Sequence, residues 1–413
     1  MSIIDTRRGM CQNHGMKYER GVVGAVVRMI QQGPPLLHVL VGARQVGKTT
    51  AAVQAVERLD LPQVFAAADT PLPPGPEWVE SQWARARSEA EATGRSVLLV
   101  LDEIQKVRGW SEQVKRLWDE DRRRNRLIHV MLLGSSSLPL QHGLSESLAG
   151  RFFLHRCPHW SWQECREAFG WDLDRWIYFG GYPGAAPLAD RPVDWRQYVA
   201  DSLVETVLSR DVLQLQTVAK PALLRHLFAL SVCFPAQVLS YNKMLGQLQD
   251  AGNTTTLAHY LKLLETAFLV SGLELFSRGQ RRKRGSSPKL VLWNQALINA
   301  LSHRPFGEAR ADAPWWGRLV ENAVGAHLLN HLPPVEWGVT YWRRGNVEVD
   351  YVVERGRAVW ALEVKSGRGG RVSGLSEFRS TYPAARTLIV GSDGIPLDEF
   401  LGSDPRRLLE SVG

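Results

Sequence analysis

The sequence lacks several features that would each place a protein in a particular class. It contains four cysteines, namely Cys11, Cys157, Cys165 and Cys233. They are scattered without metal-ligand spacing, so we expect reduced thiols in a cytoplasmic protein rather than disulfides or a cysteine-ligated metal. No uninterrupted apolar run approaches the roughly 20 residues of a membrane helix. The first residues have no apolar signal core behind their charges, and no membrane partner is expected.

Length, composition and charge describe an ordinary globular protein with a weak preference for a polyanion. The 413 residues allow two or three domains, each with its own core. A hydrophobic content of 44% and a charged content of 22% are normal for a globular chain. The net charge of +8 favours a polyanionic partner, although a nucleotide site is basic as well.

The most informative segment is residues 42–49, which read Gly-Ala-Arg-Gln-Val-Gly-Lys-Thr and match the phosphate-loop pattern G-x-x-x-x-G-K-[ST]. An apolar run at 36–41, typical of a buried parallel strand, precedes the loop, and a helical pattern follows it. Such a loop and helix N-terminus bind phosphate oxygens through backbone N–H groups. We therefore predict an ATP site, whose residues in this segment are Gly42, Gln45, Val46, Gly47, Lys48, Thr49 and Thr50.

A second buried-strand run, 96–101, ends in the acidic pair Asp102 and Glu103. An acidic pair at this position is typical of a Walker B motif, although it can also cap a helix. Asp102 is expected to complete the nucleotide site and, together with Thr49, to hold Mg2+. Glu103 is expected to orient or activate the attacking water, while Lys48 contacts the β and γ phosphates.

A third strand is predicted at 128–133, followed by three serines at 135–137 that either position the water or cap the next helix. The phosphate loop, Leu-Asp-Glu-Ile-Gln at 101–105, and Leu-Gly-Ser-Ser-Ser with a later Ser-Leu-Ala-Gly-Arg resemble a prokaryotic group of AAA+ superfamily ATPases. Members of this group pair the ATPase with a winged helix and a C-terminal endonuclease-like domain.

This resemblance implies roles for two further residues. It places Ser136 near the sensor-1 position. It also implies that Arg151 is an arginine finger, which stabilises transition-state charge at the nucleotide of a neighbouring subunit. The alternative is that Arg151 pairs with a carboxylate of its own domain.

The middle of the chain is predicted to be mainly helical. Apolar residues recur at helical spacing over 195–215, and a further helical segment follows at 221–234. A helix-turn-helix pattern then places helices at 241–248 and 254–267, and the threonines at 254–256 are expected to offer the N-cap of the second helix. The strands predicted after it, at 268–276 and 289–293, turn this pattern into a winged helix.

The loop between these two strands is strongly basic, with five basic residues in the seven positions 278–284. A basic wing beside a helix-turn-helix is suited to gripping DNA phosphates, although charge runs are often only solvated loops. Phosphate contacts position a protein without reading sequence. The residues predicted to contact DNA are Thr254, Thr255, Arg278, Arg281, Arg282, Lys283 and Arg284.

The C-terminal third contains a nuclease-like pattern. Asp350 on one predicted strand, and Glu363 with Lys365 on the next, have the spacing of a PD-D/ExK core. Two such carboxylates can hold magnesium while the lysine orients water, and Glu321 on the preceding helix could complete the metal shell. Val349 stands where the motif has proline, and such domains can instead only bind DNA or hold subunits together.

Taken together, these patterns predict an α/β chain of three domains. An AAA+ P-loop ATPase domain spans 1–184, a helical linker and winged helix 185–305, and a PD-D/ExK endonuclease-like domain 306–413. We expect an ATP- and Mg2+-dependent ATPase that forms a hexamer or other ring and remodels or moves along duplex or branched DNA. The alternatives are a nucleotide-dependent protein-interaction switch and an ATP-dependent nuclease.

Overall fold

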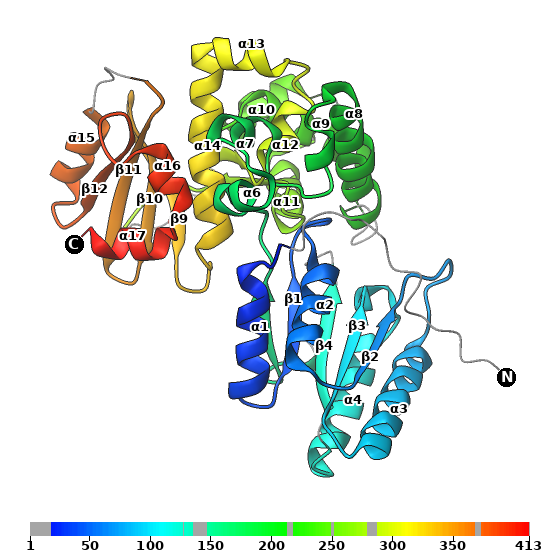
Figure 1. The fold of residues 1–413 in the computed structure, drawn as a ribbon. Helices are drawn as coiled ribbons and strands as arrows, with labels where there is room; N and C mark the ends of the chain where they lie inside the picture. Colours follow the sequence, from blue (N-terminus) through cyan, green and yellow to red (C-terminus); the bar gives the residue numbers. More distant parts are fainter. Residues whose placement is uncertain are drawn as a thin grey trace.

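The computed structural model describes residues 18–126, 128–134, 147–212, 218–248, 252–278, 287–367 and 373–412. The ribbon shows a sheet-containing N-terminal part, a mainly helical middle part and a smaller C-terminal sheet (Figure 1). None of the described helices combines the length and apolar content that a membrane-spanning helix needs.

The N-terminal part is built on a five-stranded parallel sheet of order β2-β3-β4-β1-β5. Its strands are β1 (Leu37–Val41), β2 (Gln63–Ala67), β3 (Val97–Asp102), β4 (Ile128–Gly134) and β5 (Phe152–Arg156). The strands predicted at 36–41, 96–101 and 128–133 are confirmed as β1, β3 and β4. Because all five strands are parallel, their carboxyl ends meet at one edge, where open α/β sheets bind ligands.

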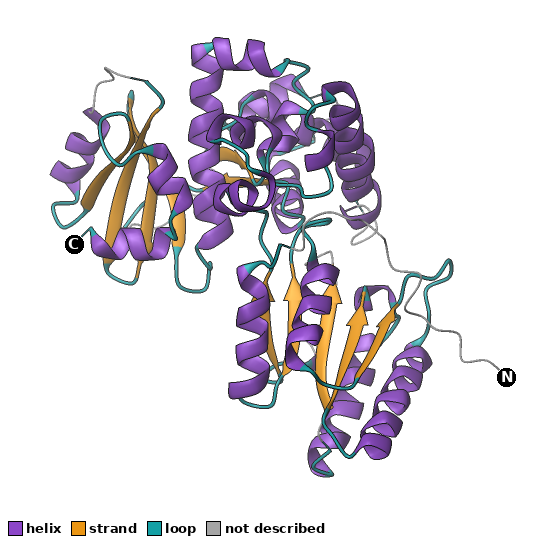
Figure 2. Cartoon of the chain, in the orientation of Figure 1, coloured by secondary structure: helices purple, strands orange, loops and turns teal. Residues whose placement is uncertain are grey.

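Helices cover both faces of this sheet, which explains why its strands are almost wholly apolar (Figure 2). On one face lie α1 (Gly21–Gln32) and α2 (Lys48–Leu59), which bury Leu40. On the other lie α3 (Pro76–Thr93) and α4 (Trp110–Arg123). A short 3-10 helix, η2 (Ile104–Lys106), follows β3.

The described residues of the first half of the middle part form helices and connecting turns, without a strand. It contains α6 (Trp162–Phe169), α7 (Leu173–Phe179), η3 (Ala186–Leu188), α8 (Pro192–Gln197), η4 (Tyr198–Glu205) and η5 (Val207–Val212). The helix predicted over 195–215 is confirmed as far as residue 212, but η4 and η5 are π-helical. The rest of that prediction lies outside the described residues.

The second half contains the expected helices and a small antiparallel sheet of order β6-β8-β7. Its elements are α9 (Pro221–Cys233), β6 (Gln237–Val238), α10 (Tyr241–Gln247), α11 (Thr254–Thr266), β7 (Val270–Leu273) and β8 (Lys289–Leu292). One detail differs from the sequence analysis. The N-cap of α11 is Asn253, whose side chain accepts from the Thr256 N–H at 2.9 Å, rather than one of the threonines.

The C-terminal sheet has the order β12-β11-β10-β9, with only the β11–β12 pair parallel. Its strands are β9 (Gly338–Arg344), β10 (Val347–Arg355), β11 (Ala358–Lys365) and β12 (Arg386–Gly391). The strands predicted at 347–353 and 358–364 are therefore confirmed. The helices of this region are α12 (Gln295–Asn299), α13 (Phe306–Ala311), α14 (Ala313–His331), α15 (Ser373–Thr381), α16 (Leu397–Gly402) and α17 (Pro405–Ser411).

One hydrophobic core extends from Trp160 to Leu409 and joins the middle part to the C-terminal sheet. It includes side chains from α7, α9, β8, α14 and β11, among them Trp176, Leu227, Leu292, Leu319 and Leu362. These two parts therefore share a core, where the sequence analysis expected separate ones. The domain boundaries at residues 184 and 305 stay predictions. Helices α6 and α7 pack in the shared core rather than against the parallel sheet.

Two buried histidines on neighbouring strands make the parallel sheet sensitive to acid. His38 on β1 and His155 on β5 are 1% and 5% exposed, and Nδ1 of His38 lies 3.2 Å from Nε2 of His155. Burial lowers the pKa of His38 to about 3, with a further contribution from His155, and burial lowers the pKa of His155 to about 4. An unfolded histidine has a pKa of about 6.5. The unfolded chain therefore binds more protons below that pH, and stability is lost as the pH falls.

We expect the free energy of unfolding to fall by about 1.4 kcal/mol for each of these histidines between neutral pH and about pH 5.5. Urea unfolding at a series of pH values measures this loss. The pH dependence should be weaker in His38→Gln. It should be unchanged in His259→Gln, at an exposed position of α11. Equal pH dependence in the wild type and His38→Gln would contradict the assignment.

Candidate functional site

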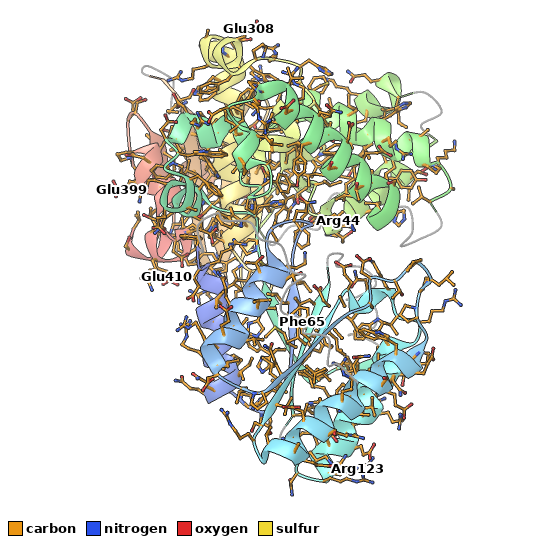
Figure 3. The ribbon with its side chains drawn as sticks, turned by 45° about the vertical axis from the view of Figure 1, so that its right-hand side comes forward. Arg44, Phe65, Arg123, Glu308, Glu399 and Glu410 are labelled. Atoms are coloured by element: carbon orange, nitrogen blue, oxygen red, sulfur yellow. The ribbon has the colours of Figure 1, made fainter. Side chains whose placement is uncertain are left out.

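The phosphate loop lies at the carboxyl edge of the parallel sheet, facing the helical middle part. Figure 3 shows its residue Arg44 at this end of the sheet and Arg123 at the opposite end. The helix α2 begins directly after the loop, and its N-cap Gly47 has a φ of 91°, which favours glycine. A Cβ added to Gly42 would lie 1.9 Å from the carbonyl oxygen of Cys157, so only glycine fits there.

The side chains predicted to hold nucleotide and metal meet at this edge. The Lys48 ammonium is buried and donates to the carbonyl oxygens of Gly42 and Ala43 at 3.0 and 2.7 Å. The Thr49 hydroxyl donates to Oδ2 of Asp102 at 2.7 Å. Burial raises the pKa of Asp102 above its usual value, although the hydrogen bond from Thr49 opposes the shift. Folding thus joins two motifs that lie 53 residues apart in the chain.

Glu103 extends this acidic end of β3 into the next turn. Its backbone N–H donates to Oδ1 of Asp102 at 2.8 Å, and its φ of 52° turns the chain sharply after the strand. The Glu103 carboxylate is half-buried and accepts from the Gln105 side-chain amide at 2.7 Å. The exposed residues Thr49 and Thr50 lie across the edge in the first turn of α2.

A clamp beneath the loop was not predicted from the sequence. The carbonyl oxygen of Val46 accepts from Nη1 of Arg20 at 3.1 Å and from Nε1 of Trp160 at 3.0 Å. Arg20 is 4% exposed and pairs with Glu164 at 2.7 Å. No local motif identifies Arg20 or Trp160, because both are brought to the loop from distant positions in the chain.

A side chain of the middle part also contacts the exposed side of the phosphate loop. Gln45, which is exposed and has a φ of 57°, accepts from the Tyr198 hydroxyl at 2.5 Å. Tyr198 lies at the start of η4, in the middle part. The phosphate loop is therefore held by side chains from both the segment after β5 and the middle part.

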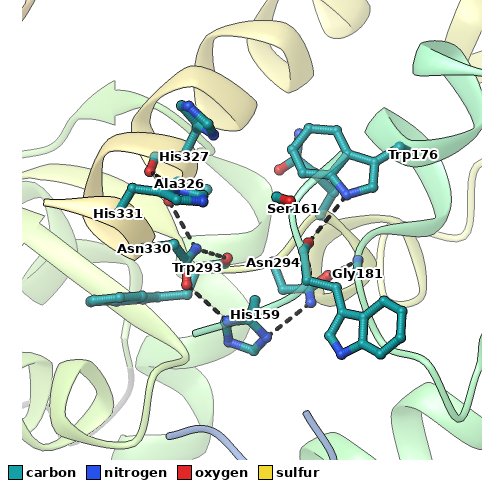
Figure 4. Close-up of a pocket in the computed structure, with 12 residues that line it drawn as sticks. His159, Ser161, Trp176, Gly181, Trp293, Asn294, Ala326, His327, Asn330 and His331 are labelled. Carbon is teal, nitrogen blue, oxygen red and sulfur yellow. Dashed lines mark hydrogen bonds between the residues drawn. The ribbon is translucent and has the colours of Figure 1, made fainter. Parts of the chain in front are cut away.

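A hydrogen-bonded junction next to the clamp connects the loop to the shared core (Figure 4). Nε2 of His159 lies 3.3 Å from the carbonyl oxygen of Phe268, which can only accept, so Nε2 carries the proton. Nδ1 of His159 then accepts from the Asn294 amide at 3.0 Å. Burial lowers the pKa of His159 to about 3, which keeps it neutral. The backbone N–H of His159 donates to Oδ1 of Asn330 on α14 at 3.0 Å.

Arg151 is paired within its own domain. Its Nε and Nη2 atoms donate to the two carboxylate oxygens of Asp119 on α4, at 2.9 and 3.2 Å. Arg151 immediately precedes β5, and its carbonyl oxygen accepts from the N–H of Leu37 at the start of β1. The phosphate loop follows the other end of β1, about 13 Å away at the usual rise of a strand. Arg151 therefore lies far from the nucleotide loop of its own chain, and the finger role stays a prediction.

The predicted sensor residue and most of the predicted DNA-contact residues lie outside the described residues, and the others are exposed at the surface. Ser136 lies outside them, as do the wing residues Arg281, Arg282, Lys283 and Arg284. Arg278 is exposed, and its Nη2 atom donates to the carbonyl oxygen of Arg357 at 2.8 Å. Thr254 and Thr255 are exposed in the first turn of α11.

The residues predicted for a nuclease site are brought into one region of the C-terminal sheet. They are Glu321 on α14, Asp350 on β10, and Glu363 and Lys365 on β11. The Lys365 ammonium pairs with Glu363 at 2.8 Å. A lysine that the motif did not predict, Lys289 on β8, lies in the same region and is fully buried. Its one sequence signal is a charge inside the apolar strand Lys-Leu-Val-Leu-Trp.

Three segments of the chain match known protein families. Residues 35–166 match a family described as AAA domain. Residues 170–306 and 316–398 each match a domain of unknown function, DUF8612 and DUF4143 respectively. No curated protein matches the chain.

Three solved structures are similar over most of their own length. Orc1 of Aeropyrum pernix in complex with DNA is 17% identical, with a TM-score of 0.29, and the match covers 70% of this chain and 93% of that chain. AMPPCP-bound DnaA from Aquifex aeolicus is 16% identical, with a TM-score of 0.30 and coverages of 60% and 89%. The Thermotoga maritima Holliday junction branch migration motor RuvB is 14% identical, with a TM-score of 0.31 and coverages of 63% and 91%.

Likenesses at these TM-scores carry no argument about function, so the assignment depends on the family match and the site itself. The match to the AAA domain covers the five-stranded parallel sheet and its loop. Residues 35–166 of this chain are therefore similar to an AAA domain and carry a phosphate loop at residues 42–49.

Proposed function

We propose that this protein hydrolyses ATP at the AAA+ domain, assembles into a hexamer or other ring, and binds and remodels or moves along DNA. The observation that carries the ATPase part is the contact between Thr49 and Asp102 at 2.7 Å, beside the buried Lys48. A hydroxyl and a carboxylate brought together at a phosphate loop are the parts that phosphoryl-transfer sites of this class use.

The chemistry assigns a task to each of these side chains. Lys48 turns from the loop carbonyls to the β and γ phosphates, while backbone N–H groups at the start of α2 bind phosphate oxygens. Thr49 and Asp102 supply oxygen donors of the kind that Mg2+ prefers, so they fit this ion and would hold it. The bound ion would neutralise charge on the phosphates. Glu103, beside Asp102, then orients and deprotonates the attacking water.

We expect Glu103→Gln to bind ATP but to hydrolyse it about a hundredfold or more slowly, because the amide cannot accept the proton of water. Steady-state phosphate release and binding of a fluorescent ATP analogue measure the two properties separately. Lys48→Ala should lose binding as well. The control Glu80→Gln alters an exposed carboxylate on α3 and should leave both properties unchanged. Substantial hydrolysis by Glu103→Gln would remove the general-base role.

The distance of Arg151 from its own loop supports a role at a neighbouring subunit. In a ring, Arg151 would leave Asp119 and approach the γ phosphate bound by the next chain. A finger contributed in this way stabilises charge that develops in the transition state.

We expect Arg151→Ala to lower kcat by about a thousandfold. Mixing it with Lys48→Ala subunits, which are inactive for a different reason, should restore part of the activity. In the mixture some interfaces combine an intact loop from one chain with an intact Arg151 from the other. Arg116→Ala, which removes an exposed arginine from α4, is the control. Full activity of Arg151→Ala, or mixtures that recover nothing, would rule out the finger.

The order of elements from α9 to β8 supports a winged helix in the middle part. The helix α9 is followed by the short strand β6, the helix pair α10 and α11, and then β7 and β8, which pair antiparallel. In this proposal the wing would be the basic segment 278–284 predicted from the sequence, most of which lies outside the described residues. A basic wing next to exposed threonines at the start of α11 would contact phosphates without reading the base sequence.

We expect DNA to stimulate ATP hydrolysis, and replacement of Arg281, Arg282, Lys283 and Arg284 by alanine to abolish the stimulation while basal hydrolysis persists. Each lost phosphate contact should make the negative slope of log affinity against log salt concentration shallower by about 0.9. Fluorescence anisotropy with duplex, single-stranded and junction DNA measures this slope. The control replaces the exposed residues Arg122, Arg123 and Arg124 at the C-terminal end of α4. Figure 3 labels Arg123 at the end of the sheet opposite Arg44. Unchanged hydrolysis with all three DNA forms would contradict the DNA-remodelling role.

One contact favours a nucleotide-dependent protein-interaction switch as a second candidate. The Tyr198 hydroxyl of the middle part donates to Gln45 in the phosphate loop. A change in the loop conformation on binding ATP would therefore alter this contact with η4. Such a switch needs neither rapid turnover nor a basic wing. The DNA-stimulation experiment therefore separates the two candidates.

A further inference from the structure

A cluster of partly buried carboxylates at the C-terminal sheet is organised around a fully buried lysine from another sheet. The Nζ atom of Lys289, on β8, lies 2.6 Å from Oε1 of Glu321 and 3.1 Å from Oε1 of Glu348. It also lies 3.6 Å from Oδ1 of Asp350 and donates to the Asp350 carbonyl oxygen at 3.1 Å. The Lys289 side chain is completely buried, and its ammonium lies over the ring of Tyr351, 4.9 Å from the ring centre.

The same three carboxylates are the ones that could hold a metal ion. One oxygen from each of Glu321, Glu348 and Asp350 lies within 4.8 Å of the others, which is a spacing suited to a shared cation. The Lys289 ammonium lies in contact with all three. It therefore occupies the position that a divalent ion would need.

The remaining nuclease-motif groups are engaged elsewhere. Glu363 pairs with Lys365 at 2.8 Å, and Oδ2 of Asp350 accepts from the N–H of Val364 at 2.7 Å. Arg318, on the first turns of α14, pairs with Oε2 of Glu321 at 3.1 Å. As arranged here, the residues of the PD-D/ExK pattern do not fit the Mg2+ that the pattern implies.

We propose that Lys289 is a tethered cation that takes the place of the divalent ion in a nuclease-like site, so that the C-terminal domain joins the chain's parts together instead of cleaving DNA. A covalently attached ammonium needs no free ion from solution, and a fully buried ammonium requires partners of opposite charge. The carboxylates of Glu321, Glu348 and Asp350 and the ring of Tyr351 surround the Lys289 ammonium and stabilise its charge.

The protonation of Lys289 agrees with this role. Burial alone would lower the pKa of its ammonium. Glu321, Asp350 and the nearby Glu348 outweigh that effect and hold the pKa well above its usual value. Lys289 is therefore charged at neutral pH.

The tether also determines where the basic loop is attached. Lys289 begins β8, directly after that loop, and Leu275 before the loop forms a bridge with Tyr341 on β9. The N–H of Phe276 also donates to the Tyr341 carbonyl oxygen at 2.6 Å. Both ends of the loop are thus anchored on the C-terminal sheet. The described residues on either side of the loop therefore contact the same sheet, a feature that does not depend on whether the loop binds DNA.

Binding of Mn2+, followed by electron paramagnetic resonance, tests the proposal on the full-length protein. Lys289→Met is one atom shorter and uncharged, so it vacates the position of the ammonium and should create a Mn2+ site. Affinity should rise by about tenfold or more over the wild type, and Lys289→Met with Glu348→Gln should lose the gain. The wild type and its Glu348→Gln variant should bind Mn2+ equally, since any binding at Asp102 is common to both.

Two results would overturn the proposal. One is wild-type binding that is lost in Glu348→Gln, which would show a working metal site despite Lys289. The other is a folded Lys289→Met protein with no gain of Mn2+, which would show that the carboxylates form an ion-pair cluster and not a metal site.

Measurements on the wild type keep the test decisive if Lys289→Met does not fold. Millimolar Mn2+ should shift the unfolding temperature of the wild type and that of Glu348→Gln by the same amount. Linear, circular and branched DNA should stay intact with Mg2+ or Mn2+. Cleavage that is lost in Asp350→Asn would overturn the proposal, whereas ATP hydrolysis in either outcome reports on the AAA+ domain alone.

Discussion

The short connection between β5 and α6 is the constraint on which the nucleotide loop and the rest of the molecule both depend. Within it, the N–H of Cys157 donates to the Val41 carbonyl oxygen at 2.7 Å and so extends the sheet to the base of the loop. Trp160 holds the loop through the carbonyl oxygen of Val46, while His159 is bonded to α14. Because these contacts occupy adjacent residues, the connection joins the phosphate loop directly to the shared core.

Two buried cations hold distant segments together in the same physical way. Arg20 pairs with Glu164, and Lys289 pairs with Glu321 and its neighbours. A buried charge without a partner is strongly unfavourable, and removing one member of such a pair costs about 3–5 kcal/mol. The segments that supply the partners must therefore stay in contact. The shared core adds apolar contacts between the middle and C-terminal parts, with α14 among the elements that supply them.

Much of the fold could be predicted because its signals are local. The apolar runs of β1, β3 and β4 report burial on both faces of a parallel sheet, and the loop pattern at 42–49 reports a backbone shape that only certain residues adopt. The helix pair α10 and α11 was visible from periodicity. The cap of α11 was misplaced by one residue, because Asn and Thr both suit that position and only the hydrogen bond to Thr256 distinguishes them.

The sequence by itself determined the phosphate loop, the acidic end of β3 and the spacing of Asp350, Glu363 and Lys365, since each depends on neighbours within one or two elements. Only the tertiary structure decided what surrounds them. It brought Thr49 to Asp102, placed Arg20 and Trp160 beneath the loop, and paired Arg151 with Asp119. It also put Lys289 among the carboxylates. The physical reason is that a charge interacts with whatever lies within a few ångströms of it, and that distance is set by packing rather than by position in the chain.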